Sequence, residues 1–118
     1  EDICYATSNR QKAIKEYADK CDAFIVVGSK NSSNSNRLVE VAKKAGCINS
    51  HLLENAESLN LSNYSSSNII GISSGASVPE ILVENIISKF QKNYSLEIEN
   101  VSLGEEDVQF KLPKEVRN

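Results

Sequence analysis

Apolar residues early in the chain follow first a helical spacing and then a continuous run. A first helix is predicted from Thr7 or Ser8, either of which can cap it, to about Lys20. The run Ala23–Val27 that follows is apolar at every position. Such a run is typical of a strand that is buried on both faces of a parallel sheet.

The same alternation of helix and strand signals continues through the middle of the chain. Gly46 is a typical stop signal for a second helix, whose apolar residues begin at Leu38. Pro79 and Glu80 are typical of the start of a third helix, which should end near Lys92. Two more strands are predicted, at Ile48–Leu53 and Ile69–Ile72. Between them we expect a short helical turn at Ala56–Leu59 and a polar loop at Asn60–Asn68.

The last part of the chain, residues 94–118, changes character. Apolar and polar residues alternate around Ile98 and again around Phe110, which indicates extended segments that add strands to a sheet, in this domain or in a neighbouring one. The whole succession predicts an α/β fold: a three-layer α/β/α lobe with a small, mainly parallel sheet over residues 1–93, and an extended C-terminal tail over residues 94–118. We expect the tail to pack on another lobe of a longer protein.

Composition limits the classes of partner. The chain has 118 residues, which suits one small domain, and its net charge is −3. Because no cluster of Lys and Arg is visible, neither a nucleic acid nor an anionic membrane is an expected partner. The longest apolar run, Ala23–Val27, is far too short to span a bilayer.

The cysteines and the single histidine give little support for a metal site when taken alone. The chain has three cysteines, Cys4, Cys21 and Cys47. An odd number of cysteines without a CxxC pair favours reduced thiols in a cytosol-like compartment over a disulfide framework. A lone Cys is more often a small core residue than a ligand. His51 has no Cys or Asp at ligand spacing, so a structural or surface position is the favoured interpretation.

Two polar loops, Ser29–Asn36 and Ser73–Ser77, carry the clearest functional signal. Each follows a predicted buried strand and precedes a predicted helix, so both should lie at the carboxyl edge of the sheet and at helix N-termini that favour an anion. Ser and Asn are also common in loops for reasons unrelated to ligands. The sequence has neither GxGxxG nor GxxxxGK[ST]. The candidate phosphate-binding residues are Ser32, Ser33, Asn34 and Ser77, with Lys30 or Arg37 as a counter-charge.

Four segments of the chain have distinctive sequences: residues 2–11, DICYATSNRQ; residues 27–38, VGSKNSSNSNRL; residues 75–80, GASVPE; and residues 111–115, KLPKE. In this order they resemble motifs of the 4-hydroxy-3-methylbut-2-enyl diphosphate reductases. Residues 2–11 are similar to the segment around the third cluster cysteine of that family, and residues 27–38 to its most recognisable loop. Residues 75–80 resemble its next loop and residues 111–115 its C-terminus.

The resemblance implies an activity and a cofactor. Enzymes of that family reductively dehydroxylate an allylic diphosphate to isopentenyl and dimethylallyl diphosphates in the non-mevalonate isoprenoid pathway. They hold a 4Fe-4S cluster by three cysteines within three similar α/β lobes, and ferredoxin or flavodoxin is the usual electron donor. By motif, Cys4 is one cluster ligand, Thr7 lies close to the cluster, and the diphosphate is bound by the four candidate residues named above.

The resemblance also implies what the chain lacks. The family takes its other two cluster cysteines, its histidines and a proton-delivering glutamate from the first two lobes, and Cys21, Cys47 and His51 lie outside the matching motifs. We therefore expect a catalytically inert fragment, the C-terminal third of a longer protein, without catalytic residues or a complete cluster site of its own. Its compartment would be the bacterial cytosol or the plastid stroma.

Two other interpretations stay open at this point. One is a free-standing, non-catalytic α/β module that binds a phosphorylated metabolite at the two helix N-termini. The other is a purely structural lobe whose polar loops only cap helices. The sequence that precedes Glu1 in the gene product would separate the module from the reductase, because the reductase needs two more cysteines upstream.

Overall fold

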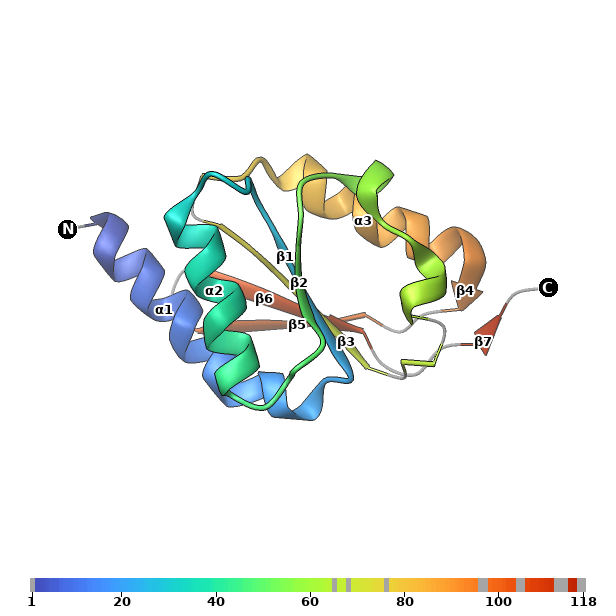
Figure 1. The fold of residues 1–118 in the computed structure, drawn as a ribbon, viewed down its shortest axis with the longest axis horizontal. Coiled ribbons are helices and arrows are strands. Elements are labelled where there is room, and N and C mark those ends of the chain that lie inside the picture. Colours follow the sequence, from blue (N-terminus) through green and yellow to red (C-terminus); the bar gives the residue numbers. More distant parts are fainter. Residues whose placement is uncertain are drawn as a thin grey trace.

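A computed structural model describes residues 2–64, 66–67, 69–75, 77–95, 98–103, 106–111 and 115–116, with side chains from Arg10 to Tyr94. The larger elements appear along the chain in the order shown in Figure 1: α1 (Asp2–Tyr17), β1 (Ala23–Val27), α2 (Ser33–Lys44), β2 (Ser50–Leu53), β3 (Ile70–Ser74), α3 (Glu80–Asn93), β4 (Tyr94–Ser95), β5 (Ile98–Leu103), β6 (Glu106–Lys111) and β7 (Glu115–Val116). Three short 3-10 helices, Ala18–Lys20, Ala56–Ser58 and Leu61–Tyr64, lie between them.

One five-stranded sheet, in the order β2-β1-β3-β6-β5, forms the centre of the molecule (Figure 1). β1 pairs in parallel with β2 and with β3, whereas β6 runs antiparallel to β3 and β5 antiparallel to β6. β4 and β7 form a separate antiparallel pair. The α/β class is thus confirmed. The predicted parallel sheet corresponds to three of the five strands, β2, β1 and β3.

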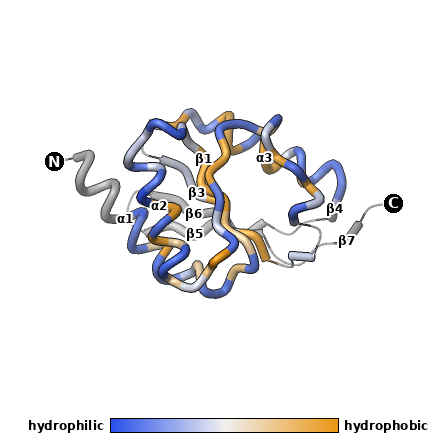
Figure 2. The backbone as a smooth tube through the Cα atoms, in the orientation of Figure 1, coloured by the Kyte–Doolittle hydropathy of each residue, from blue (hydrophilic) through white to orange (hydrophobic). Residues whose placement is uncertain are grey.

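β1 is buried along its whole length because helices cover both faces of the sheet. Phe24 and Val26 pack into a core with α1 and α2. Ala23, Ile25 and Val27 point to the other face, into a core with α3. Figure 2 shows the hydrophobic residues concentrated on β1 and β3. The continuous apolar run therefore follows from the three-layer arrangement, as predicted.

Several boundaries differ from the sequence-based expectation. α1 begins at Asp2, so Thr7 and Ser8 lie inside the helix and do not cap it. Ser and Thr cost only about 0.5 kcal/mol in a helix interior, so their presence did not fix the start. β2 begins at Ser50, and Ile48 is 84% exposed. The expected loop Asn60–Asn68 contains a 3-10 helix, because Tyr64 is buried edge-on against Phe90 with ring centroids 5.7 Å apart.

The end of α2 agrees with its predicted stop signal. Gly46 has a φ of 126° and donates its N–H to the carbonyl of Lys43 at 3.2 Å. A Cβ at this position would also lie 3.0 Å from the Cβ of Asp19. A side chain at Gly46 would therefore be strained both by backbone conformation and by contact.

The C-terminal tail contributes two strands to the same sheet. β5 and β6 form an antiparallel hairpin, and β6 pairs with β3 through Ile70–Lys111, Gly71–Phe110 and Ile72–Gln109. Parts of the alternating segments, among them Leu96 and Leu112, lie outside the described residues. Packing of the tail on a further lobe stays a prediction. None of the helices in the described part of the chain has the length and apolar character needed to cross a bilayer.

Candidate anion site at the carboxyl edge of the sheet

The loops that follow β1 and β3 lie side by side at the carboxyl edge of the sheet. The two strands are parallel neighbours, and the N–H of Gly75 donates to the carbonyl of Val27 at 3.0 Å, one residue beyond the last strand pair. α2 then packs on one face of the sheet and α3 on the other. Because these two neighbouring loops lead to helices on opposite faces of the sheet, a crevice opens between them. Such a crevice is the usual ligand site of open parallel sheets.

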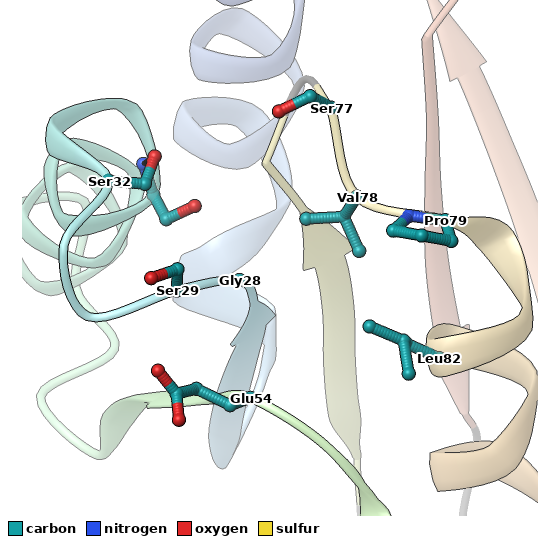
Figure 3. A pocket seen from close by; sticks show the side chains of 9 residues that line it. Gly28, Ser29, Ser32, Glu54, Ser77, Val78, Pro79 and Leu82 are labelled. Atoms are coloured by element: carbon teal, nitrogen blue, oxygen red, sulfur yellow. Dashed lines mark hydrogen bonds between the residues drawn. The ribbon is translucent and has the colours of Figure 1, made fainter.

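A pocket of about 250 Å³ occupies this crevice. Figure 3 shows Ser32 on one side of it and Ser77 on the other, with Glu54 at its lower edge. Ser33 and Asn34 are near neighbours of Ser32 in the first turn of α2 but do not line the pocket. Its lining consists of Gly28, Ser29, Ser32, Ser35, Glu54, Ser77, Val78, Pro79 and Leu82.

The loop before α2 is held by its own polar side chains. The Oγ of Ser32 accepts the N–H of Ser35 at 3.2 Å and so caps the helix. The Oγ of Ser29 accepts the N–H of Asn31 at 3.1 Å. Asn36 donates its side-chain amide to the carbonyls of Lys30 and Ser32, at 2.8 and 3.0 Å. The loop is therefore organised before any ligand arrives.

The two helix N-termini at the pocket differ in charge. The first turn of α2 contains no acidic residue. α3 begins after Pro79 without a side-chain capping bond, and Glu80 lies in its first turn. Because a carboxylate there already interacts with the helix dipole, α2 offers the more favourable end for an anion. Lys30 and Arg37, the proposed counter-charges, are both exposed near that end.

Glu54, which follows β2, was not expected at this site. Its Oε2 accepts the backbone N–H of Lys30 at 3.1 Å, which ties the end of β2 to the loop before α2. The same carboxylate lines the pocket and opposes the binding of an anion electrostatically. No local sequence signal predicts this, because β2 reaches the loop only through its parallel pairing with β1.

Arg10 joins α1 to the end of β3. Its Nη1 donates to the carbonyl of Ser74 at 2.6 Å and to the Oγ of Ser74 at 3.1 Å. Cys4 and Thr7 lie on the same helix, but their side chains are outside the described part of the structure. α1 is thus anchored next to the loop that carries Ser77.

The other two cysteines are core residues. Cys21 and Cys47 are buried between the sheet and α2. Burial, reinforced by the neighbouring Cys47 thiol and by the negative charges of Asp22 and Asp19, raises the pKa of the Cys21 thiol to about 12. Burial likewise raises the pKa of Cys47, and hydrogen bonding with Ser50 and Asn49 partly offsets this increase. Both thiols stay protonated at neutral pH, unlike the thiolates that bind iron.

The described side chains do not form a metal site by themselves. No group of three or more His, Cys, Asp or Glu that could hold a metal ion occurs among them. His51 is exposed on β2, hydrogen-bonds the side chain of Asn49 and lies edge-on to Tyr64 at 6.2 Å. An iron–sulfur cluster therefore does not fit the described residues, and of the predicted ligands only Cys4 belongs to this chain.

Comparison with known proteins identifies relatives over nearly the whole chain. Reductases named for 4-hydroxy-3-methylbut-2-enyl diphosphate from Beijerinckia indica subsp. indica and Roseobacter denitrificans are 50% and 47% identical over 117 residues, 99% of this chain. The chain spans 37% of the length of each.

Two solved structures share the fold. One is an (E)-4-hydroxy-3-methyl-but-2-enyl diphosphate reductase, described as the terminal enzyme of the non-mevalonate pathway; it has a TM-score of 0.69 and 36% identity, over 73% of this chain and 30% of that one. The other, an E-1-hydroxy-2-methyl-but-2-enyl-4-diphosphate reductase from Plasmodium falciparum, has a TM-score of 0.71 and 35% identity, over 75% and 27%. A family model described as LytB protein matches residues 1–91. The chain, with its serine-lined crevice, therefore belongs to the LytB protein family.

Proposed function

We propose that this chain is the C-terminal third of a 4-hydroxy-3-methylbut-2-enyl diphosphate reductase and that its crevice holds the substrate's diphosphate. The observation that carries the proposal is the meeting of Ser32 and Ser77 in one pocket, in a chain whose relatives bear that name. The parent enzyme would reductively dehydroxylate the allylic diphosphate to isopentenyl and dimethylallyl diphosphates.

The pocket suits a diphosphate for electrostatic and geometric reasons. The hydroxyls of Ser32 and Ser77 donate hydrogen bonds to phosphate oxygens from opposite sides. Ser33 and Asn34 add donors at the start of α2, where the helix dipole favours negative charge. Lys30 and Arg37 supply positive charge near the same end. The organised loop costs little ordering entropy when the anion binds.

Cys4 would hold one iron of a 4Fe-4S cluster, with Thr7 close by, and the longer protein would provide the other two cysteines. When bound, such a cluster delivers the electrons of the reduction. The described residues of this chain serve instead to bind and orient the diphosphate. Catalytic side chains would come from the rest of the protein, and ferredoxin or flavodoxin would donate electrons in the bacterial cytosol or the plastid stroma. No nucleic acid or membrane takes part.

The second candidate, a non-catalytic module that binds a phosphorylated metabolite, is favoured by one observation. Ser32 and Ser77 already line one pocket within the described residues of this chain, and their two hydroxyls are enough to hydrogen-bond a phosphate group. Incubation of the 118-residue chain with the allylic diphosphate and a reductant should give no turnover. Turnover would contradict the fragment proposal.

Titration of the chain with inorganic pyrophosphate, followed by amide NMR, tests the site that both candidates share. A dispersed spectrum first establishes that the chain is folded. We expect shifts concentrated at Ser32–Asn34 and Ser77, and smaller shifts when the salt concentration rises. The backbone amides of Lys92 and Asn93, two exposed residues at the far end of α3, serve as the internal control. Absence of shifts at millimolar pyrophosphate would contradict the site.

A further inference from the structure

One buried hydroxyl lies between the two loops of the crevice. Ser35, in the first turn of α2, is 1% exposed although it is polar. A Cβ added to Gly28 would lie 2.1 Å from the Oγ of Ser35, and one added to Gly75 would lie 2.4 Å from the same atom. The Ser35 hydroxyl therefore fills the space that both glycines leave free.

These glycines occupy equivalent positions in the two loops. Gly28 directly follows β1, and its N–H donates to the carbonyl of Leu53 at 2.9 Å. Gly75 directly follows β3, and its N–H donates to the carbonyl of Val27. Neither glycine has a positive φ, so each is required for space and not for backbone conformation. α2 can approach the strand ends closely only because both positions lack a side chain.

Ser35 is also linked to the pocket residues themselves. Its backbone N–H is the group that Ser32 caps, and its side chain lines the pocket. A shift of Ser35 would move Ser32 with it, because a helix turn behaves as a rigid unit. A shift of Gly75 would move the loop that leads to Ser77. The separation of Ser32 and Ser77, visible across the pocket in Figure 3, thus depends on one packing contact.

We propose that Ser35 is a positioning residue that sets the width of the anion pocket by holding the starts of the two loops at a fixed separation. The proposal rests on the proposed function, since it assumes that the crevice binds the diphosphate. It assigns Ser35 no direct contact with the substrate. The two glycines and the serine pack as one unit, so the effect of a side chain added at Gly75 should be corrected by removal of the Ser35 hydroxyl.

A double-mutant cycle tests this in the longer protein that carries the chain, with inorganic pyrophosphate as the probe. Gly75→Ala should weaken binding by about tenfold, because the new methyl meets the Oγ of Ser35. Ser35→Ala removes that oxygen and keeps the capping N–H, so alone it should weaken binding by only about threefold. The double variant should bind more tightly than Gly75→Ala, because the other atoms near the new methyl lie 3.5 Å away.

Gly28→Ala provides the matched control. Its new methyl would still meet the Cβ of Ser35, which lies 2.8 Å away, so Ser35→Ala should not rescue it. The melting temperature of each variant, measured by thermal unfolding, separates a loss of stability from a loss of affinity that is due to a displaced pocket. Rescue of the melting temperature without rescue of affinity would overturn the proposal, and so would strictly additive losses of affinity.

If Gly75→Ala does not fold, Ser35→Thr takes its place and should weaken binding more than Ser35→Ala. Equal or tighter binding by Ser35→Thr would overturn the proposal. Failure of the unaltered protein to bind pyrophosphate would overturn the anion site as well.

Discussion

The two helix N-termini that face the crevice have different electrostatic character although they lie at the same edge of one sheet. α2 begins with a serine cap, a loop held by side-chain hydrogen bonds and a first turn free of acidic residues. α3 begins after Pro79, has no side-chain cap and carries Glu80 in its first turn. From this comparison we expect α2 to supply most of the attraction for an anion and the loop before α3 to contribute mainly the Ser77 hydroxyl.

A negative charge at the start of α2 should remove the difference most completely. Asn34→Asp is expected to weaken pyrophosphate binding by more than about tenfold, since pyrophosphate carries several negative charges and each pair of like charges a few ångströms apart costs about 1 kcal/mol even in a watery environment. Titration calorimetry at low salt measures the loss. Asn85→Asp, the same change at an exposed position within α3, is the matched control and should have little effect on pyrophosphate binding. Comparable losses in both variants would mean that the charge acts at long range and that the α2 terminus is not special.

Removal of the two pocket hydroxyls should separate binding from stability. Ser32→Ala loses a donor and the helix cap, so it should weaken binding and lower the free energy of unfolding by about 1 kcal/mol. Ser77→Ala, at an exposed loop position, should weaken binding and leave stability almost unchanged. Urea unfolding beside pyrophosphate titration distinguishes the two. Equal stability of both variants would argue against a structural role for the Ser32 cap.

Glu54 gives a test in which affinity should rise. Glu54→Gln removes a negative charge from the pocket and keeps an oxygen that can accept the N–H of Lys30, so pyrophosphate should bind about threefold more tightly. Glu57 is exposed and does not line the pocket, so the control variant Glu57→Gln should leave the affinity for pyrophosphate unaltered. Weaker binding by Glu54→Gln would show that the exact hydrogen bond to Lys30 matters more than the charge.

The smallest expected effect is at α3 itself. Glu80→Gln makes the first turn of α3 more like that of α2, and a helix-dipole interaction of about 0.3 kcal/mol, the lower end of the usual range, predicts a gain in pyrophosphate affinity of roughly twofold. The gain should disappear at high salt, because Glu80 is exposed. A gain that persists in salt would contradict a purely electrostatic explanation.

The layered fold and the position of the crevice were predictable because they follow from local patterns. The apolar run at Ala23–Val27 predicted a strand covered on both faces, and each polar loop between a strand and a helix predicted an edge position. The position of Gly46 likewise predicted the end of α2. In each case the signal lies within a few adjacent residues.

Features that depend on distant partners were not predictable in this way. Glu54 reaches the pocket only through the pairing of β2 with β1, and Arg10 meets Ser74 across 64 positions of sequence. The buried serine at position 35 reads locally as one more polar residue of a Ser/Asn-rich loop. Its proposed role depends on two glycines that follow separate strands. The side chains of Cys4 and Thr7 lie outside the described residues, so their proposed roles stay predictions.

The central position of β1 has a consequence for how the chain acquires its structure. β1 pairs with β3, which lies beyond α2, β2 and two 3-10 helices in the sequence. Parallel pairing of such distant segments is intrinsically slow, and until it occurs the apolar run Ala23–Val27 has an unsatisfied edge. During synthesis this run leaves the ribosome well before its partner. The same segment that anchors the finished fold is therefore the one on which a chaperone, or an aggregating neighbour, would act first.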